Sequence, residues 1–330
     1  MARQFENRRS LSTTVAALAV GALVTMLSVS WTTSAGAAET KAAPSHDAGR
    51  VGRFTVPGPG SVNTWWIATS RGVIVIDFQR DLESAEKAID RVRQLHKPVE
   101  ALLLTHGHPD HIGGIESFKR AFPDAPLYAS QLTIDDVRND TRGYQKLTRE
   151  MLKEKAPSSY PVPERVLSAR DRIEVAGITV ETREFGPSES ESATMFYLPN
   201  SGDLFTGDVV GNKVTDFFLE QRTGIWLRQL EQVRKAYPKA RTIYPGHGDV
   251  GKAADLIRHQ RQYIEFFRAQ TKAQMDRGAW DGNELSAVDR KAVAATVEAK
   301  YPGYPPVAMI PNLLELNADA VARELAKDRR

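Results

Sequence analysis

Short runs of apolar residues, bounded by turn residues, begin at Val51 and alternate with amphipathic stretches along the chain. Such runs predict strands, whereas apolar positions that recur every three or four residues predict helices. The predicted strands are 62–69, 73–77, 101–105, 126–129, 172–175, 178–185, 193–198, 203–206 and 242–244. The clearest predicted helices are 82–95, 111–122 and 223–237. Two strand-rich halves, each flanked by helices, indicate a layered α/β sandwich.

Two regions depart from this alternation. Residues 131–163 are charged and mostly helical in composition until prolines interrupt them, so they form either a lid or a simple insertion. Beyond residue 251 no strong strand signal remains, and the predicted helices are 252–277, 285–299 and 316–328. We therefore expect a domain over 51–250 that is followed by a helical C-terminal extension over 251–330.

The first 38 residues have the composition of a targeting segment. Three arginines precede the uncharged stretch 11–31, and the small residues Ala35-Gly36-Ala37-Ala38 follow it. This order predicts a cleaved secretory signal over 1–38, read by the general or the twin-arginine pathway. The alternative is an uncleaved anchor, because the stretch is long enough to span a bilayer. We expect a secreted or periplasmic protein with a flexible linker over 39–50 and no stable membrane insertion after cleavage.

The net charge and the cysteine content limit the possible binding partners and metal ligands. The formal net charge is +3, and three arginines against Glu6 place +2 of it in the leader, which leaves +1 for the mature chain. A nearly neutral chain lacks the basic footprint of a nucleic-acid-binding protein, so we expect a small-molecule substrate and no nucleic acid. The chain contains no cysteine, so any metal ion must be bound through nitrogen and oxygen.

A histidine-rich cluster directly follows the predicted buried strand 101–105. The cluster contains His106, His108, Asp110 and His111 at a strand-to-helix turn. A turn can direct such side chains to one point, and Gly107 lets the backbone pass close to an ion. The alternative, a surface histidine tract, does not account for the apolar strand behind the cluster. The cluster therefore predicts a metal-dependent hydrolase.

The order His106-x-His108-x-Asp110-His111 resembles the signature of the metallo-β-lactamase superfamily. Three further landmarks of that family occur in the same order along the chain. They are Asp77 at the end of a strand, Asp208 in Phe205-Thr206-Gly207-Asp208, and His247 in Pro245-Gly246-His247-Gly248. The resemblance spans about residues 51–250 and implies a four-layer αββα sandwich that binds two metal ions.

One position differs from the family pattern. Many members of the family carry a histidine at the position that Glu189 occupies in the stretch Gly186-Pro187-Ser188-Glu189. Some alkylsulfatase-like members use glutamates in this half of the site. Glu189 can bind a metal through oxygen, with Glu191 as the fallback if the register slips by two residues. The opposing interpretation is that Glu189 lies on the surface and one metal site is lost. We expect the remaining histidines to be solvated: His46, His96 and His259.

The resemblance implies two divalent ions, with Asp208 between them. The expected ligands are His106, His108 and Glu189 for one ion, and Asp110, His111 and His247 for the other. Zinc is the first choice, and the extra negative charge of Glu189 makes manganese or iron the alternatives. Two cations that share a water lower its pKa from ~15.7 toward ~7, and Asp110 is the expected catalytic residue that orients the resulting hydroxide.

The expected reaction is hydrolysis of a small ester, lactone, amide or sulfate ester by this metal-bound hydroxide. The alternatives are a β-lactamase, an iron-dependent sulfur dioxygenase on the same fold, and a non-catalytic metal or ligand binder. Several aromatic residues either line the site or pack in the core: Trp65, Trp66, Phe217, Phe218 and Trp226. Residues 263–267 are expected to dock a helix face on the sandwich.

Overall fold

The computed structural model describes residues 49–328, all within one compact unit. The predicted signal over 1–38 and nearly all of the predicted linker lie outside these residues. Among the described residues, no helix combines the length and the apolar character that a membrane crossing requires.

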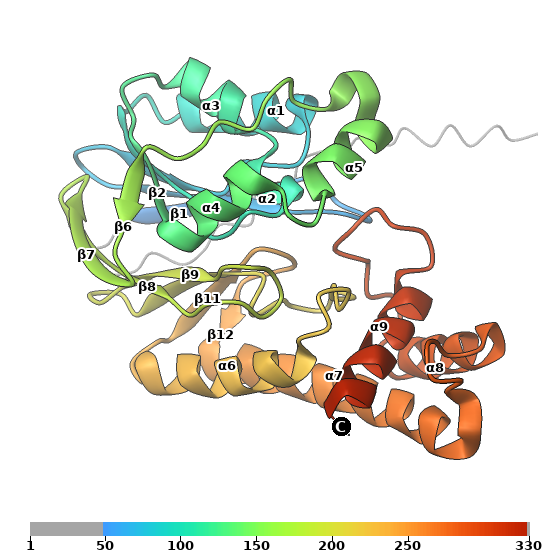
Figure 1. Cartoon of the computed structure of the whole chain (residues 1–330). Coiled ribbons are helices and arrows are strands. Elements are labelled where there is room, and N and C mark those ends of the chain that lie inside the picture. The colour runs from blue at the N-terminus through green and yellow to red at the C-terminus, as the bar shows by residue number, and fades with distance from the viewer. Residues whose placement is uncertain (1–48, 329–330) are drawn as a thin grey trace, which may run out of the picture. The chain divides into compact units, whose positions relative to one another are not determined.

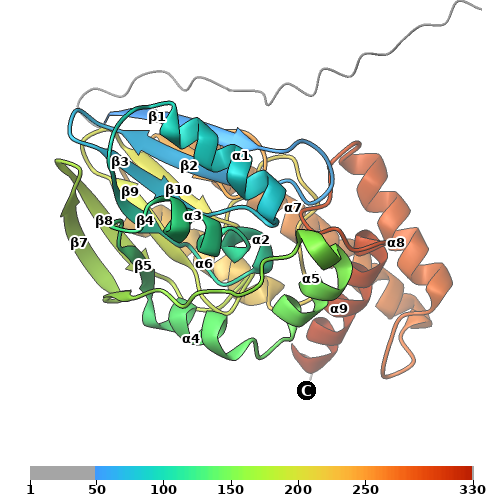
Figure 2. The same cartoon turned by 90° about the horizontal axis from the view of Figure 1, so that it is seen from above.

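Two six-stranded sheets lie face to face between two layers of helices (Figures 1 and 2). The first sheet has the order β1 (Arg50–Thr55), β2 (Asn63–Ala68), β3 (Val73–Ile76), β4 (Val99–Leu103), β5 (Leu127–Ser130) and β6 (Arg165–Leu167). The second has the order β12 (Gly251–Lys252), β11 (Thr242–Pro245), β10 (Asp203–Gly207), β9 (Thr194–Leu198), β8 (Ile178–Glu184) and β7 (Arg170–Val175). The predicted four-layer αββα sandwich is confirmed.

Helices cover the outer face of each sheet (Figure 1). On the first sheet they are α1 (Leu82–Arg93), α2 (Pro109–Ile112), α3 (Ile115–Ala121) and α4 (Gln131–Asn139), and α5 (Tyr144–Leu152) packs on α2 at the end of the sheet. On the second sheet they are α6 (Thr223–Ala236) and α7 (Ala253–Gln274), and α8 (Ala287–Lys300) and α9 (Leu313–Asp328) pack on α7. The helices of the C-terminal region share one apolar core with α6 and the second sheet.

Side-chain alternation along the strands divides the core. In β2, Trp65 points between the sheets and Trp66 points to the helices above the first sheet, and both are buried. The alternative that one of them contacts substrate is therefore wrong. Phe218 and Trp226 also belong to the core, beneath the second sheet, and so does the helix face over 263–267, which includes Phe267.

Every predicted strand and helix occurs, with three additions and one interruption. The additions are β1, β6 and β12, and β1 begins at Arg50, so the predicted linker is wrong at its last residue. The predicted helix 111–122 is interrupted at Gly113 and Gly114, and the chain forms α2 and α3 instead. At both glycines a Cβ would lie within 2.2 Å of a backbone oxygen, so no larger residue fits this close approach.

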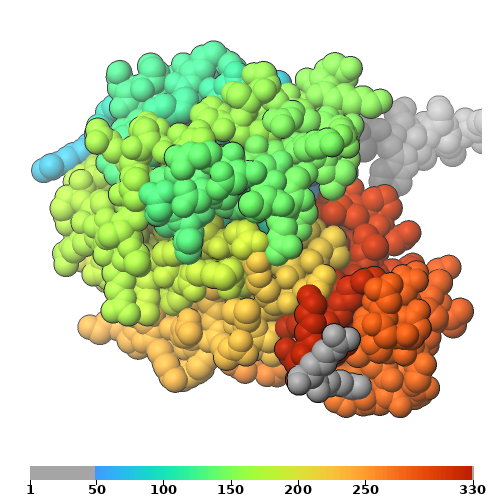
Figure 3. All heavy atoms as spheres, in the orientation of Figure 1, coloured from blue at the N-terminus to red at the C-terminus, as the bar shows by residue number. Residues whose placement is uncertain are grey.

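The segment 304–310, which we call the strap, joins α8 to α9 and returns to the sheet end. Its backbone exchanges hydrogen bonds with Thr215: Thr215 N–H donates to Pro305 at 2.9 Å, and Val307 N–H donates to Thr215 at 3.1 Å. Gly60 N–H donates to Pro306 at 2.7 Å. In Figure 3 the red surface of the strap lies beside the green surface of α5. The C-terminal region thus supplies part of the surroundings of the sheet end.

Candidate metal centre

The loops at one end of the sandwich carry all the predicted ligands. His106 to His111 follow β4, Asp208 follows β10, and His247 follows β11. Glu189 lies in the loop over 186–193, between β8 and β9. Since β3 is parallel to β4 and β10 is parallel to β11, their carboxyl ends lie together, as at other α/β ligand sites.

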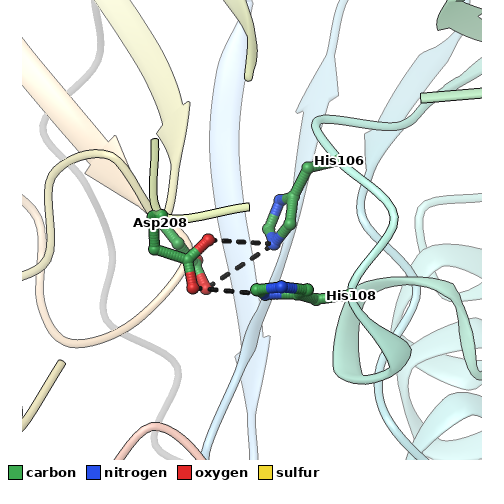
Figure 4. A group of neighbouring side chains, drawn as sticks. His106, His108 and Asp208 are labelled. Atoms are coloured by element: carbon green, nitrogen blue, oxygen red, sulfur yellow. Dashed lines mark ion pairs between the residues drawn. The ribbon is translucent and has the colours of Figure 1, made fainter. Parts of the chain in front are cut away.

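The predicted residues form two groups that share Asp208. One group is His106, His108, Glu189 and Asp208, and the other is Asp110, His111, Asp208 and His247. In each group one potential ligand atom per residue lies within 4.8 Å of all the others. All these residues are buried except Asp110, whose side chain is 19% exposed. In Figure 4, His106 and His108 face Asp208 from the other side of the centre, and a dashed line joins His106 to the carboxylate of Asp208.

Unpartnered buried atoms converge in both groups. His106 Nε2 lies 3.7 Å from an Asp208 oxygen and 3.8 Å from a Glu189 oxygen. His247 Nε2 lies 3.0 Å from Asp208 and 3.2 Å from Asp110. Among the described residues, these atoms make no hydrogen bond: Nε2 of His106, His111 and His247, Oε2 of Glu189 and Oδ1 of Asp208. Buried donors and acceptors without partners are costly, so this arrangement of electron-pair donors fits divalent cations.

The outer nitrogens of the histidines determine which ring atom faces inward. His111 Nδ1–H donates to Asp77 at 2.8 Å. The Thr105 hydroxyl donates to Asp77 at 2.9 Å and accepts from His106 Nδ1–H at 2.9 Å. His247 Nδ1–H donates to the Ser61 carbonyl. These bonds direct the Nε2 atom of each of the three rings into the centre, and that is the atom that would bind a metal.

His108 presents its other nitrogen. Its Nδ1 lies 3.2 Å from a Glu189 oxygen, so the histidine and the glutamate face each other across the first group. Burial lowers the pKa of His108, but the carboxylates of Glu189, Asp110 and Asp208 together outweigh burial and raise the pKa to about 9. Burial raises the pKa of Glu189 above its usual range, against the opposing effect of His108.

The second group is similarly polarised. Burial lowers the pKa of His247, yet Asp208 and Asp110 raise it to about 10. Burial raises the pKa of Asp208, but His111 and His247 hold it well below its usual range. His106 differs, because burial and the neighbouring His111 both lower its pKa. In the metal-free centre His108 and His247 therefore hold protons that an incoming cation must displace.

Glu184 holds both ends of the loop that carries Glu189. One oxygen of Glu184 accepts from the N–H groups of Gly186 and Ala193, both at 2.7 Å. The other accepts from the hydroxyls of Ser130 at 2.6 Å and Thr194 at 2.8 Å. These four hydrogen bonds to one carboxylate hold the loop in place. In this position the loop directs Glu189 toward His108.

Glu191 has a different role from Glu189. Its carboxylate pairs with Arg142 at 3.0 Å and Arg222 at 2.6 Å, outside both groups of potential ligands. Glu220 pairs with the same two arginines and accepts from the Tyr144 hydroxyl at 2.8 Å. This ion cluster ties the loop of Glu189 to the start of α5. The fallback position predicted at Glu191 does not face the centre.

A cleft that the sequence analysis did not predict opens beside the centre. It has a volume of about 700 Å³, counted out to its open mouth. Apolar residues of α5 and of the strap line it, and Phe217 is the predicted aromatic residue that reaches it. The signal was present as the spacing of Tyr144, Leu147 and Met151, which is the spacing of a helix face. His96 and His259 are exposed away from the centre, and His46 lies outside the described residues.

Comparisons with known proteins place this arrangement in one family. The sequence model of the metallo-beta-lactamase superfamily matches residues 57–247. A type 2 metallo-beta-lactamase of Bacteroides fragilis is 26% identical over 230 residues, which cover 66% of this chain and 84% of the relative. The linear primary-alkylsulfatase of Pseudomonas sp. (strain ATCC 19151) is 23% identical over 252 residues, covering 64% of this chain and 47% of the relative.

A solved structure extends the likeness in fold. The sec-alkylsulfatase Pisa1 of Pseudomonas sp. has a TM-score of 0.56 and 18% identity, covering 84% of this chain and 50% of that one. The share of this chain is larger than residues 51–250 can supply, so the match includes part of the C-terminal region. This chain spans about half the length of either alkylsulfatase.

Proposed function

This chain belongs to the metallo-β-lactamase superfamily, and we propose that it is an exported hydrolase that uses two divalent cations to cleave a small ester. The protein is a hydrolase of this fold, in keeping with its relatives. The observation that carries the proposal is the convergence of unpartnered, buried histidine and carboxylate atoms in two groups that share Asp208. Zinc is the first metal to test, because nitrogen and carboxylate oxygen are ordinary zinc ligands.

The residues divide the work between holding cations and orienting water. His106, His108 and Glu189 would hold one cation, and Asp110, His111 and His247 the other, with Asp208 shared. Bound cations would supply Lewis acidity and lower the pKa of water from ~15.7 toward ~7. Asp110 lines the cleft and is the most exposed member of the groups, so its carboxylate can accept a hydrogen bond from the attacking water.

Hydrolysis of a β-lactam is the second candidate, favoured by the similarity to the Bacteroides fragilis enzyme. A β-lactam carries a carboxylate that needs a cationic partner. Arg80 is the one arginine or lysine among the described residues that line the cleft, and it already donates to the Gly60 carbonyl and lies 3.6 Å from Asp81. We therefore rank an ester without such a carboxylate first.

Metal content and turnover test the proposal together. The purified protein should bind two equivalents of zinc and hydrolyse at least one substrate from a panel of carboxylic esters, lactones, amides, alkyl sulfates and a chromogenic cephalosporin. Glu189→Ala should lose about one equivalent of metal, whereas Glu191→Ala should retain both. Two bound metals with no turnover of the panel would overturn the hydrolase proposal, and unchanged metal content in Glu189→Ala would overturn the assignment of Glu189.

Export is tested separately. The arginines at positions 3, 8 and 9, the uncharged stretch over 11–31 and the small residues that follow support a cleaved signal. Sequencing the N-terminus of the exported protein should show cleavage after Ala37 or Ala38. Replacing Arg8 and Arg9 by lysine should block export through the twin-arginine pathway and leave export through the general pathway intact. Retention of the full-length chain in the membrane would support the anchor instead.

A further inference from the structure

Two apolar walls stand on either side of the cleft beside the metal groups. One wall is the face of α5 that contains Leu147, Met151 and Leu152, and the other is the strap over 307–310. The floor includes His108, Asp110, Asp208 and His247 of the proposed metal groups. The cleft is open to solvent, and the space of about 700 Å³ between its walls is counted out to the mouth.

The wall on α5 is unusual because its apolar face is not used in the core. Within α5 the one buried residue is Gln145, whereas Leu147 and Met151 are 43% and 44% exposed. Met309 on the facing strap is 44% exposed. Large apolar side chains that gather at one exposed place indicate a surface that binds something apolar.

Both walls are fastened to the fold. The strap is held through the backbone of Thr215 and Gly60. The start of α5 is held by the Tyr144 hydroxyl on Glu220 and by the pairing of Arg142 with Glu220 at 2.7 Å. Figures 1 and 3 show α5 and the strap next to each other although about 160 residues separate them in the sequence. The cleft is therefore built by the fold and not by one loose segment.

The side chains of the walls favour an aliphatic occupant. Met151 and Met309, one on each wall, are unbranched and flexible, so they can adapt their shape to an alkyl chain. The aromatic rings nearby are engaged with one another: Phe217 meets Tyr144 edge to face at 5.7 Å and His108 at 5.6 Å. The residues of α5 and of the strap that line the cleft include no charged side chain, so the two walls offer no ionic partner to a substrate.

We propose that the cleft between α5 and the strap binds the unbranched alkyl or acyl chain of the substrate and holds its ester bond over the metal groups. The substrate class is then an ester with an apolar chain of several carbons, and the C-terminal region sets that preference through the strap. The position of the ester bond rests on the proposed hydrolase function. The inference that the cleft binds an alkyl or acyl chain depends only on the two apolar walls.

A series of esters tests chain recognition during turnover. With the metal-loaded protein, kcat/KM for 4-nitrophenyl esters should rise about two- to fourfold per added methylene, from acetate until the cleft is filled. Leu147→Gln and Met309→Gln should raise KM for the decanoate about fivefold to tenfold and leave the acetate nearly unchanged. Leu132→Gln is the matched control, because Leu132 is 45% exposed on α4 outside the cleft. Equal kcat/KM across the series would overturn the proposal.

Equilibrium binding separates this inference from the hydrolase proposal. Alkyl sulfonates of four to twelve carbons, kept below micelle-forming concentrations, should bind the metal-loaded protein more tightly as the chain lengthens. Leu147→Gln should remove most of that gain, whereas Leu132→Gln should keep it. If binding depends on the length of the alkyl chain but no ester is hydrolysed, the proposed function is overturned and alkyl binding in the cleft is supported. If short esters are hydrolysed but binding does not depend on the length of the alkyl chain, alkyl binding in the cleft is overturned and the proposed function is supported.

Discussion

The metal centre and the cleft beside it are built on opposite principles. In the centre several ligands are held by a second residue: Asp77 positions His111 and, through Thr105, His106, and Glu184 holds the loop of Glu189. The cleft walls carry exposed side chains that make few specific contacts. The centre therefore tolerates little change, while the cleft can change its preference without loss of the fold.

The residues of the metal centre and the residues that would select the substrate therefore lie in different parts of the chain. The centre draws on the loops after the strands, which the matched family region over 57–247 contains. The cleft draws on α5 and on the strap, and the strap lies beyond that region. Functional sites are grafted on a shared fold, so substrate preference must be argued from the walls and not from the family.

The largest effect should follow from removing the shared ligand. Asp208→Ala takes one carboxylate from both groups, so metal content should fall from two equivalents to one or none, and kcat/KM should fall more than about a hundredfold. Metal analysis of the purified variant and ester assays measure this. Asp203→Asn is the control, since Asp203 is a buried aspartate at the other end of β10. Retention of two tightly bound metals in Asp208→Ala would contradict the assignment.

A second effect tests the support of the centre. Glu184→Gln places an amide where four donors converge, so at least one N–H or hydroxyl loses its acceptor. Affinity for one of the two metals should fall about 10- to 100-fold, and the other metal should be retained. Competition with a chelator measures both affinities. Glu181→Gln on the same strand should change neither, and an equal loss in both variants would mean a general loss of folding.

The protons held by the centre predict a dependence on pH. The pKa values of about 9 for His108 and about 10 for His247 mean that both rings are protonated near pH 7 in the metal-free protein. Each proton that a cation displaces raises the apparent metal affinity up to about tenfold per pH unit, so affinity should rise between about pH 6 and pH 9. Calorimetry in two buffers of different ionisation enthalpy counts the released protons. Affinity that stays constant over this range would contradict the pKa directions.

The sequence predicted the centre better than the cleft for a physical reason. Ligands such as His106 and His108 lie close together at the end of an apolar strand, so their convergence is a local property of the chain. Glu189 could be placed because it stands where the family pattern carries a histidine, in the loop between β8 and β9. The short strands β6 and β12 depend on neighbours for their pairing, and β6 leaves Val166 exposed at its centre.

The cleft depends on contacts between distant segments. The spacing of Leu147 and Met151 predicts an amphipathic helix, but the same spacing describes a helix that faces the core. Only the fold shows that this face meets the strap over 304–310, which Thr215 holds from a loop about ninety residues away. The same limit applied to Trp65, because its ring contacts Phe205 and Tyr244 on the second sheet, which is distant in the sequence.

The smallest expected effect concerns the one arginine of the cleft. Arg80 is engaged by the Gly60 carbonyl and by Asp81, so Arg80→Gln should change KM for the decanoate ester by less than about twofold. Steady-state assays measure KM, and a thermal melt shows whether the variant is folded. A large rise in KM, with the melting temperature unchanged, would mean that Arg80 leaves Asp81 to pair with a charged group on the substrate. The cleft would then bind an anionic group as well as an alkyl chain. Arg80 could in that case pair with the carboxylate of a β-lactam, and hydrolysis of a β-lactam would be favoured.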